Sequence, residues 1–302
     1  MTTENLQIIE SRKFELIVAP DEKTMGKLSG QKLLSLLAEY TTKVPVVLNL
    51  AAAPSQDTSY EEIIRQYRDR KRQQINVNWN NVHVLHLDDY VDLKREHPNT
   101  FESYLNQHLL DELPIPKDQV HLIKAVQADL QKTETVDSER LAEEYENIMS
   151  FTIREVRSKA GVYIAHIGYG VNGHMAFNEP HIDKYTKRLV IPVQIDRTSI
   201  QQQYDDYKNH PNPTARYKSI DDVPKNAITV TMAGILDADY IVCVVPGHHK
   251  AQAVKGAIDG VLIDSLPASM SRLARDFRLY TTKDSASKLI QAPIPDYESY
   301  SL

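Results

Sequence analysis

The sequence predicts an α/β fold in which a mostly parallel sheet carries helices on both faces, as in a Rossmann-like three-layer sandwich. Two observations support this prediction. Short apolar runs alternate along the chain with longer segments whose apolar residues recur at helical spacing. The short runs are also nearly continuous in apolar residues, which is typical of parallel strands that are buried on both faces.

The expected strands begin near the N-terminus and recur along most of the chain. They are the apolar runs at 14–20, 44–52, 82–90, 161–168, 188–195, 227–230, 240–246 and 277–282. Helical spacing predicts helices over 23–40, 59–73, 100–113 and 137–156. The polar segment 204–222 contains two prolines, so we expect a long surface loop or lid there. Residues 1–13 are expected to form a polar extension, and residues 14–302 a single domain.

The composition narrows the class of protein. The chain has 302 residues, 41% of them apolar and 25% charged, and no apolar run of membrane-spanning length. The N-terminus lacks the basic-then-apolar pattern of a secretory signal, and the single cysteine, Cys243, cannot form an intrachain disulfide. We therefore expect a cytoplasmic protein without a membrane partner. The net charge of −6 and the lack of a dense basic stripe argue against nucleic acid as a partner.

Polar residues follow the strand at 82–87, in the stretch "LDDY". Ligands of open parallel sheets bind at the carboxyl ends of strands, so Asp88 and Asp89 are candidates for a site. Successive strand residues point to opposite faces, so we expect one carboxylate to enter the site and the other to anchor a turn. Partial desolvation at the end of an apolar strand makes a carboxylate a stronger base. Simple capping of the loop by Asp88 remains an alternative.

A second polar cluster follows the strand at 161–167, in "HIGYGVNGHMAFNEP" (166–180), which holds three of the ten glycines. His174 lies five residues before Glu179, a pairing suited to general acid–base chemistry in which the carboxylate orients the imidazole. The glycines permit tight turns and could turn their amides toward an anion. A structural turn capped by polar residues is the alternative interpretation.

Two cofactor hypotheses fit these residues poorly. The spacing of Gly168, Gly170 and Gly173 is that of a dinucleotide fingerprint, but no helix start follows before Pro180. A metal site at Asp88, Asp89 and Asp92 lacks a second cluster with ligand spacing. We therefore expect no cofactor and no metal.

The two clusters together resemble the glucosamine-6-phosphate deaminase/isomerase family. The stretches that carry the resemblance are "LDDYVDL", "EHPNTFESYL" and "GYGVNGHMAFNEP", and the similarity continues through 223–260. It covers most of the chain, from about Phe14 to Thr282. The "FNEP" ending is specific, because the related 6-phosphogluconolactonases carry a serine–leucine–phenylalanine–proline type of ending.

The resemblance implies conversion of glucosamine 6-phosphate, or a close analogue, to fructose 6-phosphate and ammonium. Asp88 matches the base that moves a proton between C2 and C1, and His174 the acid–base that opens the sugar ring. Glu179 matches the carboxylate partner of the histidine, and Asn172 a neighbour that orients it. Asn172 is often aspartate in the family, and an asparagine can orient the ring but cannot stabilise a histidinium by charge. The resemblance also implies a homo-oligomer.

Five residues are candidates for contacts to the substrate. Lys250 matches the phosphate-side lysine of the family. The other candidates are Ser55, Gly168, Gly173 and Asp89.

The chain departs from the family where phosphate is expected to bind. The family's glycine–threonine turn is replaced by "NLAAAPSQDTSY" (49–60), in which Pro54 donates no amide and Asp57 is expected to repel an anion. Gln203 takes the place of the family's phosphate-clamping arginine, and Arg197 is expected to point away on the same helix. Ser55, Thr58, Ser59, Arg216 and Lys250 are the candidates for an altered anion pocket.

Three further functions stay open at this point. The chemistry could act on a different sugar phosphate or on an unphosphorylated amino sugar. The chain could be a non-catalytic sugar-binding paralogue, or, as the most distant alternative, a lactonase. Asp88, His174 and Glu179 together favour catalysis, because a binding protein has no chemical need for all three.

Overall fold

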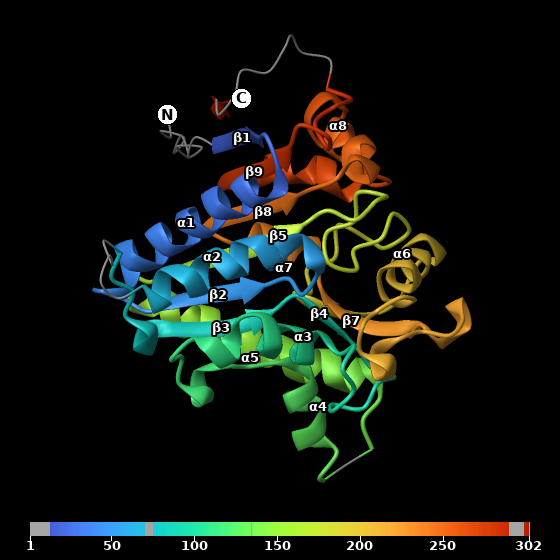
Figure 1. The fold of residues 1–302 in the computed structure, drawn as a ribbon. Helices are drawn as coiled ribbons and strands as arrows, with labels where there is room; N and C mark the ends of the chain where they lie inside the picture. Colours follow the sequence, from blue (N-terminus) through green and yellow to red (C-terminus); the bar gives the residue numbers. More distant parts are fainter. Residues whose placement is uncertain (1–12, 70–74, 134, 290–298, 302) are drawn as a thin grey trace, which may run out of the picture.

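A seven-stranded sheet forms the centre of the fold in the computed structural model, which describes residues 13–69, 75–133, 135–289 and 299–301. In spatial order its strands are β10 (Ser299–Ser301), β1 (Lys13–Ala19), β9 (Asp276–Thr282), β8 (Tyr240–Val245), β5 (Val162–Gly168), β2 (Val46–Leu50) and β3 (Val82–His86). Every neighbouring pair is parallel except β10 and β1, which are antiparallel (Figure 1). The predicted mostly parallel sheet is therefore confirmed.

A second, three-stranded sheet is antiparallel. It consists of β4 (Asp88–Tyr90), β7 (Asn226–Val230) and β6 (Val190–Gln194). The run 82–90, expected as one strand, is divided at Leu87. The Leu87 amide bonds to the Leu50 carbonyl in the large sheet, and its own carbonyl accepts the amide of Val230 in the small one. The expectation that 188–195 and 227–230 join the parallel sheet is wrong, because an apolar run does not specify its pairing partner.

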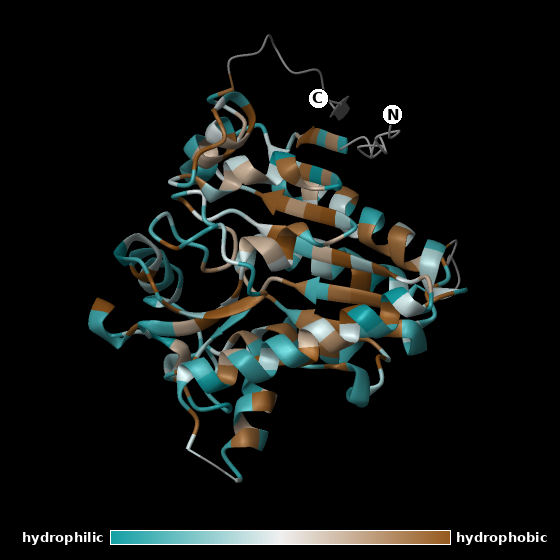
Figure 2. Ribbon diagram, turned by 180° about the vertical axis from the view of Figure 1, so that it is seen from behind, coloured by the Kyte–Doolittle hydropathy of each residue, from teal (hydrophilic) through white to brown (hydrophobic). Residues whose placement is uncertain are grey.

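Helices cover both faces of the large sheet, which gives the predicted three layers. On one face lie α1 (Glu22–Thr41), α2 (Asp57–Arg68) and α3 (Phe101–His108). On the other lie α4 (Ile123–Leu130), α5 (Ser138–Ser158), α7 (Met232–Leu236) and α8 (Ala251–Asp259). Side chains alternate along β5 accordingly, since Tyr163 and Ala165 pack with the second group and Ile164 with the first. Figure 2 shows apolar strands between helices that carry polar residues on their outer surfaces.

One helix, α6 (Arg197–Tyr207), lies apart from these layers, beside the carboxyl ends of the parallel strands (Figure 1). The segment 204–222 was expected to be a surface loop, but its first residues complete α6. Further along, Ala215, Tyr217 and Val223 are buried against Tyr207 in a small apolar cluster of their own. Part of this polar segment is therefore packed, because its few apolar residues gather on one side.

The described part of the chain begins directly with the first strand of the large sheet. Residues 1–12 of the expected extension lie outside the described residues, and Lys13, assigned to that extension, is the first residue of β1. Cys243 is buried on β8. None of the helices in the described ranges is long and apolar enough to cross a membrane.

Candidate active site

A cavity opens at the carboxyl ends of β2, β3, β5 and β8, where parallel sheets bind their ligands. It encloses about 530 Å³, part of it open to solvent. Of the candidate catalytic and substrate-binding residues, the ones that line it are Ser55, Asp88, Gly168, His174 and Lys250. The fold thus brings four segments that are distant in sequence to one site.

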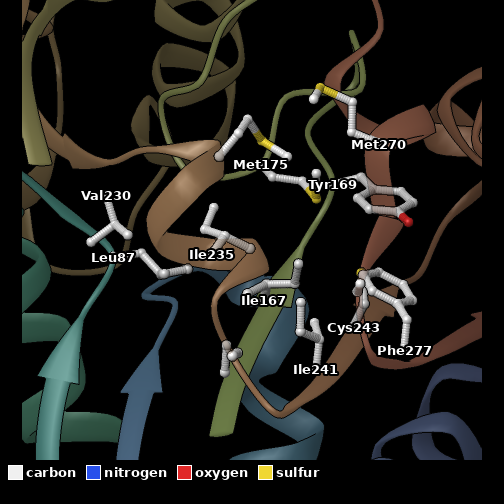
Figure 3. Close-up of a cluster of buried hydrophobic side chains, with 14 of the residues drawn as sticks. Leu87, Ile167, Tyr169, Met175, Val230, Ile235, Ile241, Cys243, Met270 and Phe277 are labelled. Atoms are coloured by element: carbon white, nitrogen blue, oxygen red, sulfur yellow. The ribbon is translucent and has the colours of Figure 1, made fainter. Parts of the chain in front are cut away.

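Two apolar side chains hold the glycine-rich turn after β5 against the hydrophobic core. Tyr169 and Met175 point into the apolar cluster around Ile167 and Met270 (Figure 3). Gly170 faces the imidazole of His174 so closely that a Cβ atom there would lie 2.0 Å from the ring carbon Cε1. At position 170 only glycine allows the ring to pack against this stretch of backbone.

The amides of this turn do not form an anion cradle. Gly170 donates its amide to the His174 carbonyl at 2.9 Å, and Gly173 donates to the Gly170 carbonyl at 3.0 Å. Gly173 has a φ of +79° and does not line the cavity, so its expected contact with substrate is not supported. Its role is conformational. No helix lies between β5 and β6, so the turn also lacks the helix that a dinucleotide fingerprint needs.

His174 is oriented by Asn172. The carbonyl oxygen Oδ1 of Asn172 lies 2.7 Å from Nδ1 of His174, and Nδ2 of Asn172 donates to Oε2 of Glu179 at 2.9 Å. Because the carboxylate can only accept, the amide must present its oxygen to the ring. Nδ1 therefore carries the proton, and Nε2 is left to exchange a proton with a ligand.

Glu179 supplies the negative charge beside this ring. Its carboxylate is fully buried, and Oε2 lies 3.4 Å from Nδ1 of His174. Burial raises the pKa of Glu179, but hydrogen bonds and charge from His174, with hydrogen bonds from Ser199 and Asn172, outweigh burial and lower it to about 2. Asn172 cannot stabilise a histidinium by charge, and the structure shows that Glu179 is close enough to do so.

A third polar group reaches the same nitrogen, and no sequence pattern predicts it. Oγ of Ser199, on α6, lies 3.0 Å from Nδ1 of His174, and Ser199 is 2% exposed. A serine in a polar helix has no local pattern that distinguishes it from its neighbours. Only the packing of α6 against the turn brings Ser199 to the ring.

Asp88 enters the cavity from the other side, beyond Leu87. It is buried, and burial, followed by the charges of Asp89 and Glu179, raises its pKa well above the ordinary value. A hydrogen bond from the Phe177 amide opposes part of this shift. When ionised, a carboxylate in this environment is a stronger base than one in water.

Asp89 points away from the cavity, as the strand alternation predicted for one member of the pair. Its carboxylate accepts the backbone amides of Tyr90 at 2.8 Å and of Phe101 and Glu102 at 3.0 Å each, which fixes the start of α3. Burial raises its pKa to about 7 against these hydrogen bonds. A direct contact of Asp89 with substrate is therefore not supported.

The side chains of Asp88, Asp89 and Asp92 do not converge as the ligands of a metal ion would. The carboxylate of Asp92 accepts the amides of Lys225 at 3.3 Å and Asn226 at 3.1 Å rather than joining Asp88. Within the described residues, no group of three or more histidine, cysteine, aspartate or glutamate side chains could hold a metal ion.

Lys250 forms the cationic end of the cavity. It is 5% exposed, and its Nζ donates to Oγ of Ser55 at 2.6 Å. Burial lowers the pKa of Lys250 to about 8, although the charge of Asp206 opposes the shift. No ion pair joins Lys250 to a carboxylate in the described part of the chain, so its charge is available to an anionic ligand.

Two amides of the turn after β2 are already bonded within the turn. The amide of Gln56 bonds to the Ala53 carbonyl at 2.9 Å, and that of Asp57 to the Pro54 carbonyl. Asp57, which was expected to repel an anion, does not line the cavity. Its carboxylate accepts the Tyr104 hydroxyl at 2.5 Å and pairs with His108 at 2.9 Å, outside the cavity.

Arg216, a candidate for the anion pocket, does not line the cavity, and Arg197 lies outside it as expected. Gln203 lines the cavity, together with Gln202 and Gln56. Arg197 and Arg216 are exposed and do not line it, and the Arg216 guanidinium donates to the carbonyls of His210 and Pro211. Beside Asp88 and His174, the polar side chains that line the cavity are therefore one lysine, one serine and three carboxamides.

Comparison with known proteins identifies the family. A family model described as glucosamine-6-phosphate isomerases/6-phosphogluconolactonase matches residues 58–280. The chain belongs to this family. Among relatives of the glucosamine-6-phosphate isomerase/6-phosphogluconolactonase family, a glucosamine-6-phosphate deaminase of Thermoanaerobacter sp. (strain X514) is 25% identical over 284 residues, 94% of this chain and 98% of the relative.

Solved structures show that the fold is shared across both branches of the family. A monomeric glucosamine-6-phosphate deaminase superposes with a TM-score of 0.74 at 22% identity, covering 90% of this chain and 98% of that one. The 6-phosphogluconolactonase of Trypanosoma brucei superposes with a TM-score of 0.65 at 16% identity, covering 92% and 100%. At these identities the likeness establishes the fold, and the reaction has to be argued from the site.

Proposed function

We propose that this protein isomerises and deaminates an amino-sugar phosphate, releasing ammonium and a ketose phosphate. The observation that carries the proposal is that Asp88, His174 and Lys250 line a single cavity. The first two are the groups that ring opening and proton transfer need, and the third is a cation for the phosphate end. The names of the deaminase relatives support the same reaction.

Ring opening falls to His174. Nδ1 holds its proton toward Asn172, so Nε2 can take the proton of the anomeric hydroxyl and deliver it to the ring oxygen. Glu179 stabilises the imidazolium that forms between these two transfers. The open-chain product is an aldehyde with an amino group on the adjacent carbon.

Proton transfer between carbons falls to Asp88. The ionised carboxylate removes the proton from C2 and returns it to C1. In the same conversion the aldehyde oxygen gains a proton and the amino group loses one, so that C1 becomes an alcohol and C2 an imine. Water then adds to the imine carbon, and ammonia leaves as the ketone forms. The raised pKa of Asp88 favours this role, because the acid it becomes can give the proton back to carbon.

A second candidate is the same reaction on an unphosphorylated amino sugar. The observation in its favour is the replacement of a glycine turn and an arginine by Ala51–Ala53, Pro54 and Gln203. Carboxamides both donate to and accept from hydroxyl groups, whereas a phosphate dianion can only accept. This alternative keeps Asp88 and His174 in the same roles.

The test is a panel assay that measures ammonia and ketose from glucosamine 6-phosphate, other amino-sugar 6-phosphates and the unphosphorylated sugars, with 6-phosphogluconolactone in a parallel hydrolysis assay. We expect ammonia release without added cofactor, and none from Asp88→Asn. Ammonia from the free sugars alone would select the second candidate. Lactone hydrolysis without ammonia release from any sugar would overturn both.

A further inference from the structure

Three acceptor atoms converge on Nδ1 of His174, and one of them comes from a helix outside the turn. Asn172 Oδ1 lies at 2.7 Å, Ser199 Oγ at 3.0 Å and Glu179 Oε2 at 3.4 Å. Asn172 and Glu179 belong to the same glycine-rich segment as His174. Ser199 belongs to α6, so it is the group that connects the ring to another element.

The Ser199 hydroxyl has a defined direction here. Nδ1 carries the proton, so Ser199 can only accept from the ring, and its own proton is free for another acceptor. Ser199 is also one of the groups that lower the pKa of the buried Glu179. The hydroxyl therefore accepts from the imidazole, and Glu179 is the nearby carboxylate toward which its own proton can turn.

The position of Ser199 depends on how α6 lies against the cavity. Along α6 only Ser199 and Tyr207 are buried. Between them Gln202 accepts the amide of Val171 at 3.4 Å, and Gln202 and Gln203 both line the cavity. The same helix thus contacts the ring, the turn and the space where a ligand would bind.

We propose that Ser199 is a positioning residue that holds His174 with its proton on Nδ1 and Nε2 free, and that it makes this orientation depend on the placement of α6. The proposal rests on the proposed function for its kinetic consequence. Its structural part, the state of the His174 ring, does not. A ligand that contacts Gln202 and Gln203 would, through α6, also fix the ring that acts on it.

The experiment compares Ser199→Ala with Thr198→Ala. Thr198 is the preceding residue of α6 and is exposed, so its variant removes a hydroxyl from the same helix without touching the ring. Imidazole ¹⁵N and Nδ1 proton signals are recorded on ligand-free protein with labelled histidine. The His174 signal is assigned by its loss in His174→Gln, because the chain has eleven histidines.

We expect Ser199→Ala to speed exchange of the His174 Nδ1 proton and lower kcat about three- to ten-fold, the usual range for one lost hydrogen bond, with little change in KM. Thr198→Ala should match the parent protein. Ser199→Cys fills the space of the hydroxyl, but a thiol forms only weak hydrogen bonds. Its ring signals and kcat should therefore resemble those of Ser199→Ala, which would exclude lost packing as the cause. Thermal unfolding verifies that each variant is folded.

An unchanged His174 ring signal in both Ser199 variants would overturn the proposal. A change in KM with kcat unaltered would overturn it as well. If no amino sugar is turned over, the proposed function fails, and the ring signals still decide the role of Ser199. A ring that changes equally in Thr198→Ala would show a general disturbance of α6 and would also count against it.

Discussion

Nζ of Lys250 lies 2.6 Å from Oγ of Ser55, although the two residues are 195 positions apart in the sequence. Lys250 follows β8 and Ser55 follows β2, and β5 lies between these two strands in the sheet. The pair forms the cationic end of the cavity that Asp88 and His174 also line.

Lys250→Met should weaken binding of a sugar phosphate about 10- to 100-fold, because it removes a charge-assisted contact from a buried position. Titration calorimetry measures the effect. Arg216→Met is the matched control, since this arginine is exposed and does not line the cavity. Equal losses in the two variants would mean that long-range charge rather than contact governs binding.

The same lysine predicts a pH dependence of anion binding. Burial lowers its pKa to about 8, so its charge in the free protein is complete well below pH 8 and is lost as the pH rises through that value. We expect phosphate affinity to fall above about pH 8 in the parent protein. In Lys250→Met the curve should be flat over this range, and a fall that persists there would assign the titration to another group.

Asp88→Asn should abolish exchange of the C2 proton with solvent, because the amide keeps the shape of the side chain but is not a base. Proton NMR of the substrate in D₂O measures the exchange directly. In the parent protein, exchange should decline with falling pH well above the usual range of an aspartate, since the pKa of Asp88 is raised by burial and by neighbouring charges. Substantial exchange in the variant would place the base elsewhere.

Asp89→Asn should lower the free energy of unfolding and leave the catalytic rate nearly unchanged. Asp89 accepts three backbone amides at the start of α3, and loss of such a capping carboxylate costs about 1–2 kcal/mol of unfolding free energy. Asp92→Asn is the control, because Asp92 also accepts amides but is exposed. Denaturant unfolding compares the two, and a larger loss at Asp92 would contradict the prediction.

Glu179→Gln should make the free energy of unfolding depend less steeply on pH in the acid range. The pKa of Glu179 is about 2 in the folded protein, below its ordinary value of 4.5, so its ionised form stabilises the fold above pH 4.5 and this contribution is lost as the pH falls toward 2. The contribution is on the order of 3 kcal/mol. Unfolding measured from pH 6 to pH 2 should show a shallower decline in the variant than in the parent protein.

The oligomeric state remains a prediction. The family resemblance implies a homo-oligomer, whereas one solved relative is described as a monomeric glucosamine-6-phosphate deaminase. Light scattering distinguishes the two. A single species at 34.4 kDa, the mass of one chain, would refute the oligomer.

The sequence by itself determined the α/β class, the parallel sheet and the family. Apolar runs and helical spacing are local properties, and the motif around His174 and Glu179 is continuous in the chain, so both can be read without coordinates. The alternation of side chains on a strand also determined that the side chains of Asp88 and Asp89 point in opposite directions.

Only the tertiary structure decided how the two sheets divide at Leu87, where Asp57 points and which residue of α6 meets His174. Each depends on contacts between segments far apart in the sequence. Asp57 accepts a hydrogen bond from Tyr104 and lies 2.9 Å from His108, both on α3, and Ser199 reaches Nδ1 because α6 packs against the glycine turn. Local patterns carry no information about such partners, because pairing and packing are set by the fold as a whole.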